Sequence, residues 1–256
     1  MSKKLRVLVV DDDWPMAKTL VDILRAKGYG AEAAYSGSEA LERMREDRFD
    51  CVLTDIKMPD VNGVELLREI KAVRPELPVL FMSAYATGEL VKQGLKEGAV
   101  GSLVKPLDID LLLWFFHRLG EERSVVIVSG DPQFRRTWGQ TLRERGFAVT
   151  VLGNGKGLEE TLKPDGQVVL LSLKAGGDTG LEVLRKIRTR YAHLPVIVVA
   201  DPREEMVPLI EDALELSVHG CLYKPFGTEE LIRALTEIRR VELGRLLQRS
   251  STAAVV

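Results

Sequence analysis

The chain has 256 residues, of which 45% are hydrophobic and 29% are charged, and its formal net charge is -2. This composition is typical of a globular protein, and the length allows one large or two ordinary domains. The near-neutral charge excludes the strongly basic footprint of a nucleic-acid-binding domain, so we expect no nucleic-acid partner. No apolar run approaches the 18 residues of a membrane span, and we therefore expect no membrane contact and a cytoplasmic location.

Short apolar runs alternate with amphipathic segments along the first half of the chain. The predicted strands cover residues 6–10, 31–34, 51–54, 78–83 and 102–104. The predicted helices cover residues 16–27, 36–46 (opened by a Ser36/Glu39 capping box), 63–73, 87–97 and a last segment from 108. Strict alternation of strands and helices predicts an α/β fold with five parallel strands and helices on both faces.

The same pattern restarts at Ser124. SVVIVSGDPQF matches LRVLVVDDDWP, QVVLLSLKAGGDTG matches CVLTDIKMPDVNG, and CLYKPF matches SLVKPL, at offsets of 117 to 119 residues. An internal repeat of this length indicates a duplicated domain. We expect domains at 1–120 and 121–243 with a short junction between them, followed by a helix end and a disordered tail at 244–256.

Two cysteines, Cys51 and Cys221, lie in predicted core strands about 170 residues apart. At this separation and in these surroundings, they are expected to be small buried hydrophobic residues. Neither a disulfide nor a cysteine metal site is predicted.

Polar residues follow the strands of the first copy, at Asp11, Asp12, Asp55, Ser83 and Lys105. In a doubly wound sheet these strand ends meet at one edge, so we expect the five side chains around one crevice. Two like charges about 5 Å apart repel by roughly 3 kcal/mol at an effective dielectric of 20, so the carboxylates need a counter-charge. A divalent cation would supply it, and oxygen-only ligands at a wet site favour Mg2+. The lysine and the hydroxyl would then hold a phosphoryl group.

These motifs make the first copy resemble the receiver domain of bacterial two-component response regulators. The acid pair in VVDDDW, the acid in LTDIKMPDVNG, the hydroxyl in FMSAY and the lysine in LVKPL occur in the family's order, with spacings of 43 to 44, 28 and 22 residues. The resemblance covers residues 3 to 120. It implies a flavodoxin-like, receiver-type sheet with strand order 2-1-3-4-5, and the repeat implies two such sheets in tandem.

The resemblance also implies a role for each residue of the site. Asp55 would attack the phosphorus of a phosphohistidine, carried by a histidine kinase or a phosphotransfer protein, and become an acyl phosphate. The metal ligands would be Asp12, Asp55, the backbone carbonyl of Lys57 and, through water, Asp11. Ser83 and Lys105 would bind the phosphoryl oxygens, and the Lys105-Pro106 bond is expected to be cis.

Two positions next to the site need separate interpretations. Receivers usually carry Tyr or Phe three residues before the lysine as a rotameric switch, whereas this chain has Ser102. We therefore expect the output to be carried by the loop Ala84–Gly88, in which Tyr85 offers an aromatic side chain. Asp13 is expected to cap the first helix rather than to bind metal.

The second copy keeps the framework and loses the site. Ser129, Gly130, Ser172 and Ala200 stand at the positions of Asp11, Asp12, Asp55 and Ser83, and only Lys224-Pro225 is retained. Without the acids we expect neither a metal site nor an acyl phosphate here, and Asp131 is expected to be a helix cap. This copy resembles a degenerate receiver, or pseudo-receiver, kept for surface contacts.

Two helices suggest where contacts are made. The last helix of the first copy, DIDLLLWFFHRLG, is apolar nearly all round, and such a helix is expected to be buried. We expect its face with Leu111, Trp114 and Phe115 to pack against the second copy or a second chain, which allows a homodimer; the competing interpretation is that one aromatic folds back on the core. The final helix, from about Thr228, is longer than the fold requires.

The leading hypothesis is a response regulator that signals to an unidentified downstream protein by contact and is not an enzyme. Three alternatives stay open: a phosphorylation-independent scaffold of receiver fold, the N-terminal regulatory part of a longer signalling protein, and a metal-dependent phosphohydrolase. Against the last, Lys57 stands two residues after Asp55, where such an enzyme would carry a second Asp.

Overall fold

The computed structural model describes residues 4–85, 88–163, 166–173, 180–201 and 206–253. It divides into unit 1, residues 1–121 with 239–256, and unit 2, residues 122–238. The predicted second domain, 121–243, therefore differs from unit 2 in residues 239–243, which group with unit 1. None of the helices in the described ranges is long and apolar enough to cross a bilayer.

Unit 1 contains a parallel five-stranded sheet in the order β2-β1-β3-β4-β5. Its strands are β1 (Arg6–Val10), β2 (Gly30–Ala34), β3 (Cys51–Asp55), β4 (Val79–Ser83) and β5 (Gly101–Val104). Its helices are α1 (Trp14–Ala26), α2 (Gly37–Glu46), α3 (Gly63–Val73), α4 (Glu89–Lys96) and α5 (Ile109–Gly120). Each predicted strand agrees to within one residue at either end, and the predicted helix start at residue 87 lies outside the described residues.

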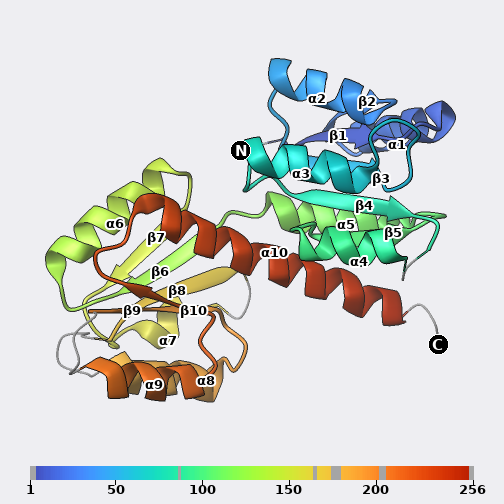
Figure 1. Cartoon of the computed structure of the whole chain (residues 1–256). Helices are drawn as coiled ribbons and strands as arrows, with labels where there is room; N and C mark the ends of the chain where they lie inside the picture. Colours follow the sequence, from blue (N-terminus) through green and yellow to red (C-terminus); the bar gives the residue numbers. More distant parts are fainter. Residues whose placement is uncertain (1–3, 86–87, 164–165, 174–179, 202–205, 254–256) are drawn as a thin grey trace. The chain divides into compact units, whose positions relative to one another are not determined.

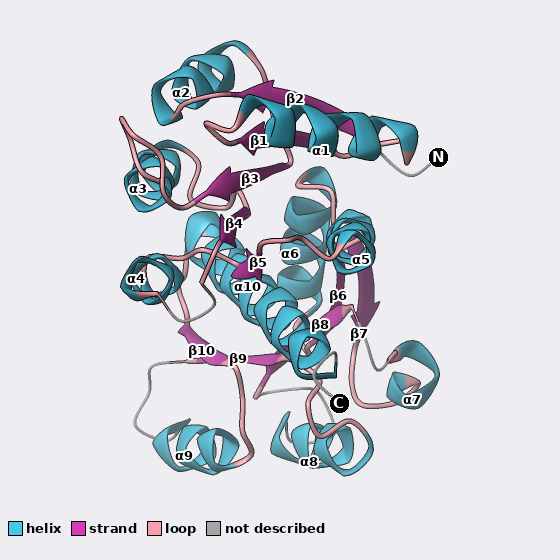
Figure 2. Cartoon of the chain, turned by 90° about the vertical axis from the view of Figure 1, so that its right-hand side faces the viewer, coloured by secondary structure: helices cyan, strands magenta, loops and turns pink. Residues whose placement is uncertain are grey.

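Helices cover both faces of this sheet. Figure 2 shows α1 and α5 on one face and α2, α3 and α4 on the other (see also Figure 1). Alternate residues of β1 enter the two cores: Val7 and Val9 pack towards α1 and α5, and Leu8 and Val10 towards the other three helices. A strand that is buried on both faces needs apolar residues at every position, which explains its unbroken hydrophobic run.

Unit 2 repeats the architecture, with strand order β7-β6-β8-β9-β10. Its strands are β6 (Ser124–Val128), β7 (Ala148–Leu152), β8 (Gln167–Ser172), β9 (Val196–Ala200) and β10 (Gly220–Tyr223). Its helices are α6 (Pro132–Glu144), α7 (Leu158–Thr161), α8 (Gly180–Arg190), α9 (Val207–Glu215) and the first part of α10 (Thr228–Ala253). Residues of α6 and α10 share one core, and those of α7, α8 and α9 the other. The predicted order 2-1-3-4-5 is confirmed in both copies.

The capping boxes differ from the prediction. Ser36 caps α2 by accepting from the Glu39 backbone N–H at 3.1 Å, but the Glu39 carboxylate accepts from Tyr35 N at 2.7 Å, so the expected box is only half formed. A complete box opens α3, where Asn62 and Glu65 accept each other's backbone N–H groups. This box fixes the start of the helix that follows β3.

Helix α5 buries the aromatic side chain of Phe115. Its side chain has no exposed area and packs against Phe116 with 5.5 Å between the ring centroids. Burial of Phe115 agrees with both interpretations of this helix, the face that packs on another partner and the aromatic that folds back on the core, and does not decide between them. Leu111 and Trp114 are half-buried against the same cluster, and their contact with another chain stays a prediction.

Helix α10 crosses the boundary between the units: Ile238 ends unit 2, and Arg239 begins the part that belongs to unit 1. Leu243 and Leu247 from this second part are 1% and 3% exposed and join the core cluster of α1 and α5. The helix continues to Ala253, so most of the predicted disordered tail is helical. Residues 254–256 lie outside the described part of the chain.

Candidate functional site

Four strands of unit 1 end in polar residues at the same edge of the sheet. Asp11 follows β1, Asp55 ends β3, Ser83 ends β4 and Lys105 follows β5. The Lys105 backbone N–H donates to Ser83 O at 2.8 Å, which extends the pairing of β4 and β5 into the site. Asp11, Asp55 and Ser83 are buried and the lysine is half-buried, so four of the five predicted residues lie at this edge, whereas the fifth, Asp12, is exposed.

The Lys105 ammonium is the counter-charge of the two buried acids. Its Nζ lies 2.8 Å from Asp11 Oδ2 and also forms an ion pair with Asp55 Oδ1. Burial raises the pKa of Asp11, although the hydrogen bond from Lys105 acts in the opposite direction. Burial by itself would lower the pKa of Lys105, but the two carboxylates outweigh it and raise that pKa. The lysine therefore stays protonated between the acids.

The second oxygen of Asp55 is held by the backbone. Asp55 Oδ2 accepts from the Lys57 N–H at 2.6 Å. The same loop packs closely on the start of α3, because a Cβ atom at Gly63 would lie 2.5 Å from the Asp55 carbonyl oxygen. Glycine is thus required at this close approach, and the loop holds the Asp55 side chain at the strand end.

Ser83 is bonded to the loop that follows it. Its Oγ donates to Tyr85 O at 2.9 Å and accepts from Tyr85 N at 3.1 Å. The Tyr85 ring is 66% exposed, and the Lys57 Nζ lies 5.7 Å from its centroid. The Ser102 hydroxyl, at the family's switch position, is buried and finds no hydrogen-bond partner among the described residues. The contacts of Ser83 therefore lead to Tyr85, although residues 86 and 87 of this loop lie outside the described ranges.

The predicted cation site can be compared with this geometry. Across the described residues, no three acidic, histidine or cysteine side chains converge closely enough to hold a metal ion. Asp12 is exposed, whereas Asp11 and Asp55 share Lys105. The donor chemistry does suit a hard cation, because carboxylates and the Lys57 carbonyl offer only oxygen. Binding of Mg2+ here would require the acids to be shared with the lysine.

In unit 2 the positions that correspond to Asp11, Asp12 and Asp55 carry no acid. Ser129 and Ser172 are buried at the ends of β6 and β8, Gly130 lies half-buried beside them, and Ala200 ends β9 within the core. Asp131 caps α6, accepting from the backbone N–H groups of Gln133 and Phe134 at 2.9 and 3.2 Å, as predicted. Asp13 caps α1 in the same way, through Met16 N at 3.1 Å.

Aromatic residues surround the retained lysine of unit 2, which the sequence analysis missed. The Lys224 Nζ lies 4.7 Å from the centroid of Phe134. Phe226 stacks on Trp138 with 4.6 Å between centroids and meets Phe134 edge to face. The available signal was three aromatic residues without aromatic counterparts in the first copy. Both Lys105-Pro106, as expected, and Lys224-Pro225 are cis.

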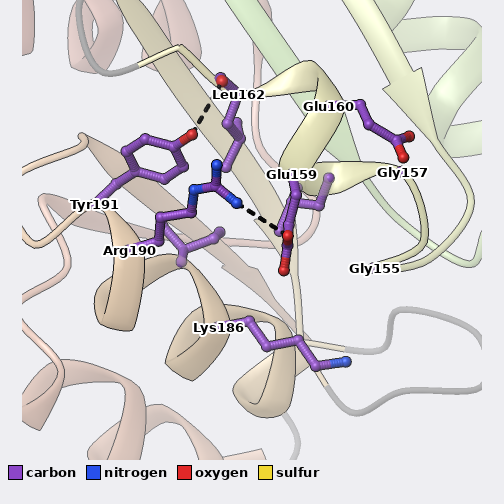
Figure 3. Close-up of a pocket in the computed structure, with 10 residues that line it drawn as sticks. Gly155, Gly157, Glu159, Glu160, Leu162, Lys186, Arg190 and Tyr191 are labelled. Carbon is purple, nitrogen blue, oxygen red and sulfur yellow. Dashed lines mark hydrogen bonds and ion pairs between the residues drawn. The ribbon is translucent and has the colours of Figure 1, made fainter.

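A pocket of about 240 Å3 lies elsewhere in unit 2, between α7 and α8 (Figure 3). Leu158, Leu162 and Ile187 supply its apolar lining. Two of its polar side chains bond within the lining: Arg190 contacts Glu159 at 3.0 Å, and the Tyr191 hydroxyl donates to Leu162 O at 3.3 Å. None of the lining residues belongs to the strand ends that carry the candidate site.

Comparison with known proteins identifies the family. The family model described as the response regulator receiver domain matches residues 7–115 and again 125–236. A response regulator receiver protein of Anaeromyxobacter sp. strain Fw109-5 is 31% identical over 235 residues, which are 92% of this chain and 95% of that protein. The chain belongs to the response regulator receiver family of two-component systems and contains two receiver domains.

Other relatives match one receiver domain. The transcriptional regulatory protein ZraR of Escherichia coli K12 is 47% identical over 106 residues, which are 41% of this chain but 24% of ZraR. A solved receiver domain protein of Methanospirillum hungatei is 33% identical, covers 46% of this chain and 94% of its own, and has a TM-score of 0.43. The chain thus spans nearly all of the Anaeromyxobacter protein and about a quarter of ZraR.

Proposed function

We propose that Asp55 of unit 1 accepts a phosphoryl group from a histidine kinase or phosphotransfer protein, and that the chain signals through protein contacts. The observation that carries the proposal is the environment of Asp55: one carboxylate oxygen pairs with Lys105, and the other accepts the Lys57 N–H. The side chain is held at the C-terminal end of β3, and a cation is in place for the charge that a phosphoryl group brings.

In the proposed transfer, Asp55 itself is the group that reacts with the phosphoryl donor, and no second substrate is bound. An Asp55 carboxylate oxygen attacks the phosphorus of the donor phosphohistidine, a P–O bond forms, and the P–N bond breaks with its electron pair returning to the imidazole nitrogen. Lys105 and the Ser83 hydroxyl bind the phosphoryl oxygens and offset their charge. The chain modifies itself once and does not turn over a phosphoester, so we propose that it is not a phosphohydrolase.

Receiver domains as a class bind Mg2+, and a solved response regulator TrrA of Thermotoga maritima is a complex with Mg2+ and BeF. In this chain the ligands would be Asp12, Asp55, the Lys57 carbonyl and, through water, Asp11. When bound, the ion would offset the charge of the acids and of the phosphoryl group. The oxygen-only donor set supports this assignment.

Unit 2 serves as an interaction module in this proposal. The absence of a carboxylate at Ser129, Gly130 and Ser172 removes the chemistry and leaves the fold. Large apolar side chains are exposed at Leu214 of α9 and Tyr223 of β10, 54% and 48% respectively, which suits a contact surface.

In unit 1 the output would pass from Ser83 to the exposed Tyr85. Tyr85→Ala is expected to retain phosphorylation and to lose binding of the downstream partner.

The intact mass of the protein after incubation with acetyl phosphate and Mg2+ tests the proposal. We expect one added phosphate, its loss in Asp55→Asn and in the presence of EDTA, and its retention in Ser172→Ala. A phosphate that persists in Asp55→Asn would contradict the assigned acceptor. If neither acetyl phosphate nor the purified cognate kinase modifies the chain, the phosphorylation-independent scaffold becomes the better description.

A further inference from the structure

The second part of α10 covers the open edge of the unit 1 sheet. β5 is the edge strand and pairs only with β4. Along this edge the Arg240 Nη1 donates to Ala99 O at 3.1 Å, and Leu243 and Leu247 are buried in the cluster of α5. An exposed edge strand can bind another chain through its unpaired backbone groups. Here the second part of α10, from the same chain, covers that edge.

The fit is close at two glycines, one on each side. A Cβ atom at Gly244 of α10 would lie 2.7 Å from Val100 O, and one at Gly101 of β5 would lie 2.6 Å from Leu247 Cδ1. Either side chain would force the helix away from the strand. The β5 edge therefore accepts a helix with a small residue between two leucines, the pattern that residues 243–247 present.

The receiver fold does not itself require this cover. The corresponding strand of unit 2, β10, is also an edge strand, but a Cβ atom at Gly220 would have no described residue within 4 Å, and Tyr223 is 48% exposed. Unit 2 therefore forms the same five-stranded sheet with its edge strand β10 left uncovered. The segment 239–247, named here the clasp, is an addition to unit 1 rather than a part that the fold needs.

The covered strand leads directly into the candidate site. β5 has only four residues, and the residue that follows it is Lys105, the cation between Asp11 and Asp55. Converting the Asp55 carboxylate into an acyl phosphate adds about one negative charge. Lys105 must then follow the phosphoryl oxygens, and the short strand that carries it is bonded on one side only.

We propose that the clasp is an internal ligand of the β5 edge that is released when Asp55 is phosphorylated, so that the unphosphorylated chain masks a helix-binding surface. This inference rests on the proposed function, because it needs a phosphoryl group on Asp55. Coupling is reciprocal: if phosphorylation weakens the clasp, holding the clasp in place must oppose phosphorylation. The freed edge then takes an amphipathic helix of the same pattern from a partner.

A disulfide between Gly101→Cys and Leu247→Cys tests this reciprocity. A Cβ atom at Gly101 lies 3.8 Å from Leu247 Cβ, which is the usual Cβ separation in a disulfide. The variant is made in a Cys221→Ser background, and the reduced form of the same protein is the reference. We expect an intramolecular disulfide, and phosphate uptake from acetyl phosphate at least tenfold slower in the oxidised form, restored by dithiothreitol.

Each contrary result has a distinct meaning. Equal uptake by the oxidised and reduced forms overturns the clasp and leaves the proposed function intact. Disulfide-linked dimers show that the segment binds a second copy and overturn the internal ligand. Absence of phosphate on the wild-type chain, with acetyl phosphate and with the cognate kinase, removes the proposed function and the clasp with it.

Hydrogen exchange on the wild-type chain gives a measurement that needs no cysteine. We expect the amides of 239–247 to exchange at least tenfold faster after phosphorylation, with no change in Asp55→Asn. Unchanged exchange in a chain that has taken up phosphate overturns the proposal. Leu247→Asp should take up phosphate several times faster than wild type, whereas Arg245→Asp, an exposed position on the same segment, is the matched control and should not.

Discussion

In unit 1 the lysine after the last strand, Lys105, lies between two carboxylates, whereas its counterpart in unit 2, Lys224, lies over the ring of Phe134. The sheets have the same strand order, and the cis peptide bond after the lysine is kept. The fold therefore tolerates the replacement of a buried charge cluster by an aromatic one. The two units thus differ in a few strand-end side chains and not in the scaffold, and the proposed function assigns phosphoryl acceptance to unit 1 on that difference.

The two edge strands differ as well. β5 is covered by Leu247, which approaches Gly101, and β10 leaves Tyr223 exposed. Since both strands close the same kind of sheet, the cover reflects the sequence after Ile238 rather than the needs of the fold. Both differences between the units can be tested by substitution, metal binding and thiol labelling.

The largest expected effect concerns the division of α10. Leu243→Ala should destabilise unit 1, and Leu235→Ala should destabilise unit 2, each by about 3 kcal/mol, because both side chains are buried in different cores. Native-state hydrogen exchange of the β1 and β6 amides would report the two units separately. A loss of protection in β6 but not in β1 on Leu243→Ala would contradict the assignment of this residue to unit 1.

Replacing each lysine should show that the carboxylate partners of Lys105 contribute more to stability than the aromatic partner of Lys224. Lys105→Met leaves Asp11 and Asp55 without their cation, and we expect unit 1 to lose about 2 kcal/mol in metal-free buffer, since the lysine is partly exposed. Lys224→Met removes only a cation–π contact and should cost less than about 1 kcal/mol. Urea unfolding of the two variants checks the difference, and equal losses would remove the contrast.

Magnesium should act on unit 1 alone. At ten times its dissociation constant, a bound ion stabilises the native state by about 1.4 kcal/mol, and we expect this shift in the β1 amides but not in the β6 amides. EDTA should abolish it. Asp12→Asn is expected to weaken the shift, whereas Asp131→Asn should not change it, because Asp131 is a helix cap. A shift confined to unit 2 would refute the assignment.

The last prediction concerns the reactivity of the two cysteine thiols and leaves the stability of either unit unchanged. Burial raises the pKa of the Cys51 thiol and also that of Cys221, so both are protonated at neutral pH. Cys51 has no exposed area, and Cys221 is half-buried. Iodoacetamide at pH 8 should therefore label Cys221 roughly a hundred times faster, since Cys51 reacts only after the strand opens. Similar rates at both positions would show that β3 is less protected than its burial implies.

Much of the candidate site could be predicted from the sequence. The strands could be placed because each is a short apolar run ended by a polar residue, and parallel strands bring those ends together. Asp55, Lys105 and Ser83 were found in this way, and the repeat predicted the second sheet. The missing acids of the second copy were equally plain, since Ser172 cannot form an acyl phosphate.

Other features depended on contacts between distant residues. No local pattern distinguishes Phe115 from its neighbours in an all-apolar helix, and only packing decided that it enters the core. The shared ion pair of Lys105 required the three strand ends to be in place.

The sequence by itself determined the repeat, the alternation of strands and helices and the chemistry of the strand ends, because these follow from local periodicity and from the side chains present. The strand order of each sheet was implied by the resemblance to receiver domains. Only the tertiary structure decided that the end of α10, which follows unit 2 in the chain, belongs to the core of unit 1. Helical periodicity shows that Leu243 and Leu247 share a face. Whether that face is buried depends on the surface it packs against, which lies far away in the sequence. Gly101 contacts Leu247 only because the fold brings α10 to β5.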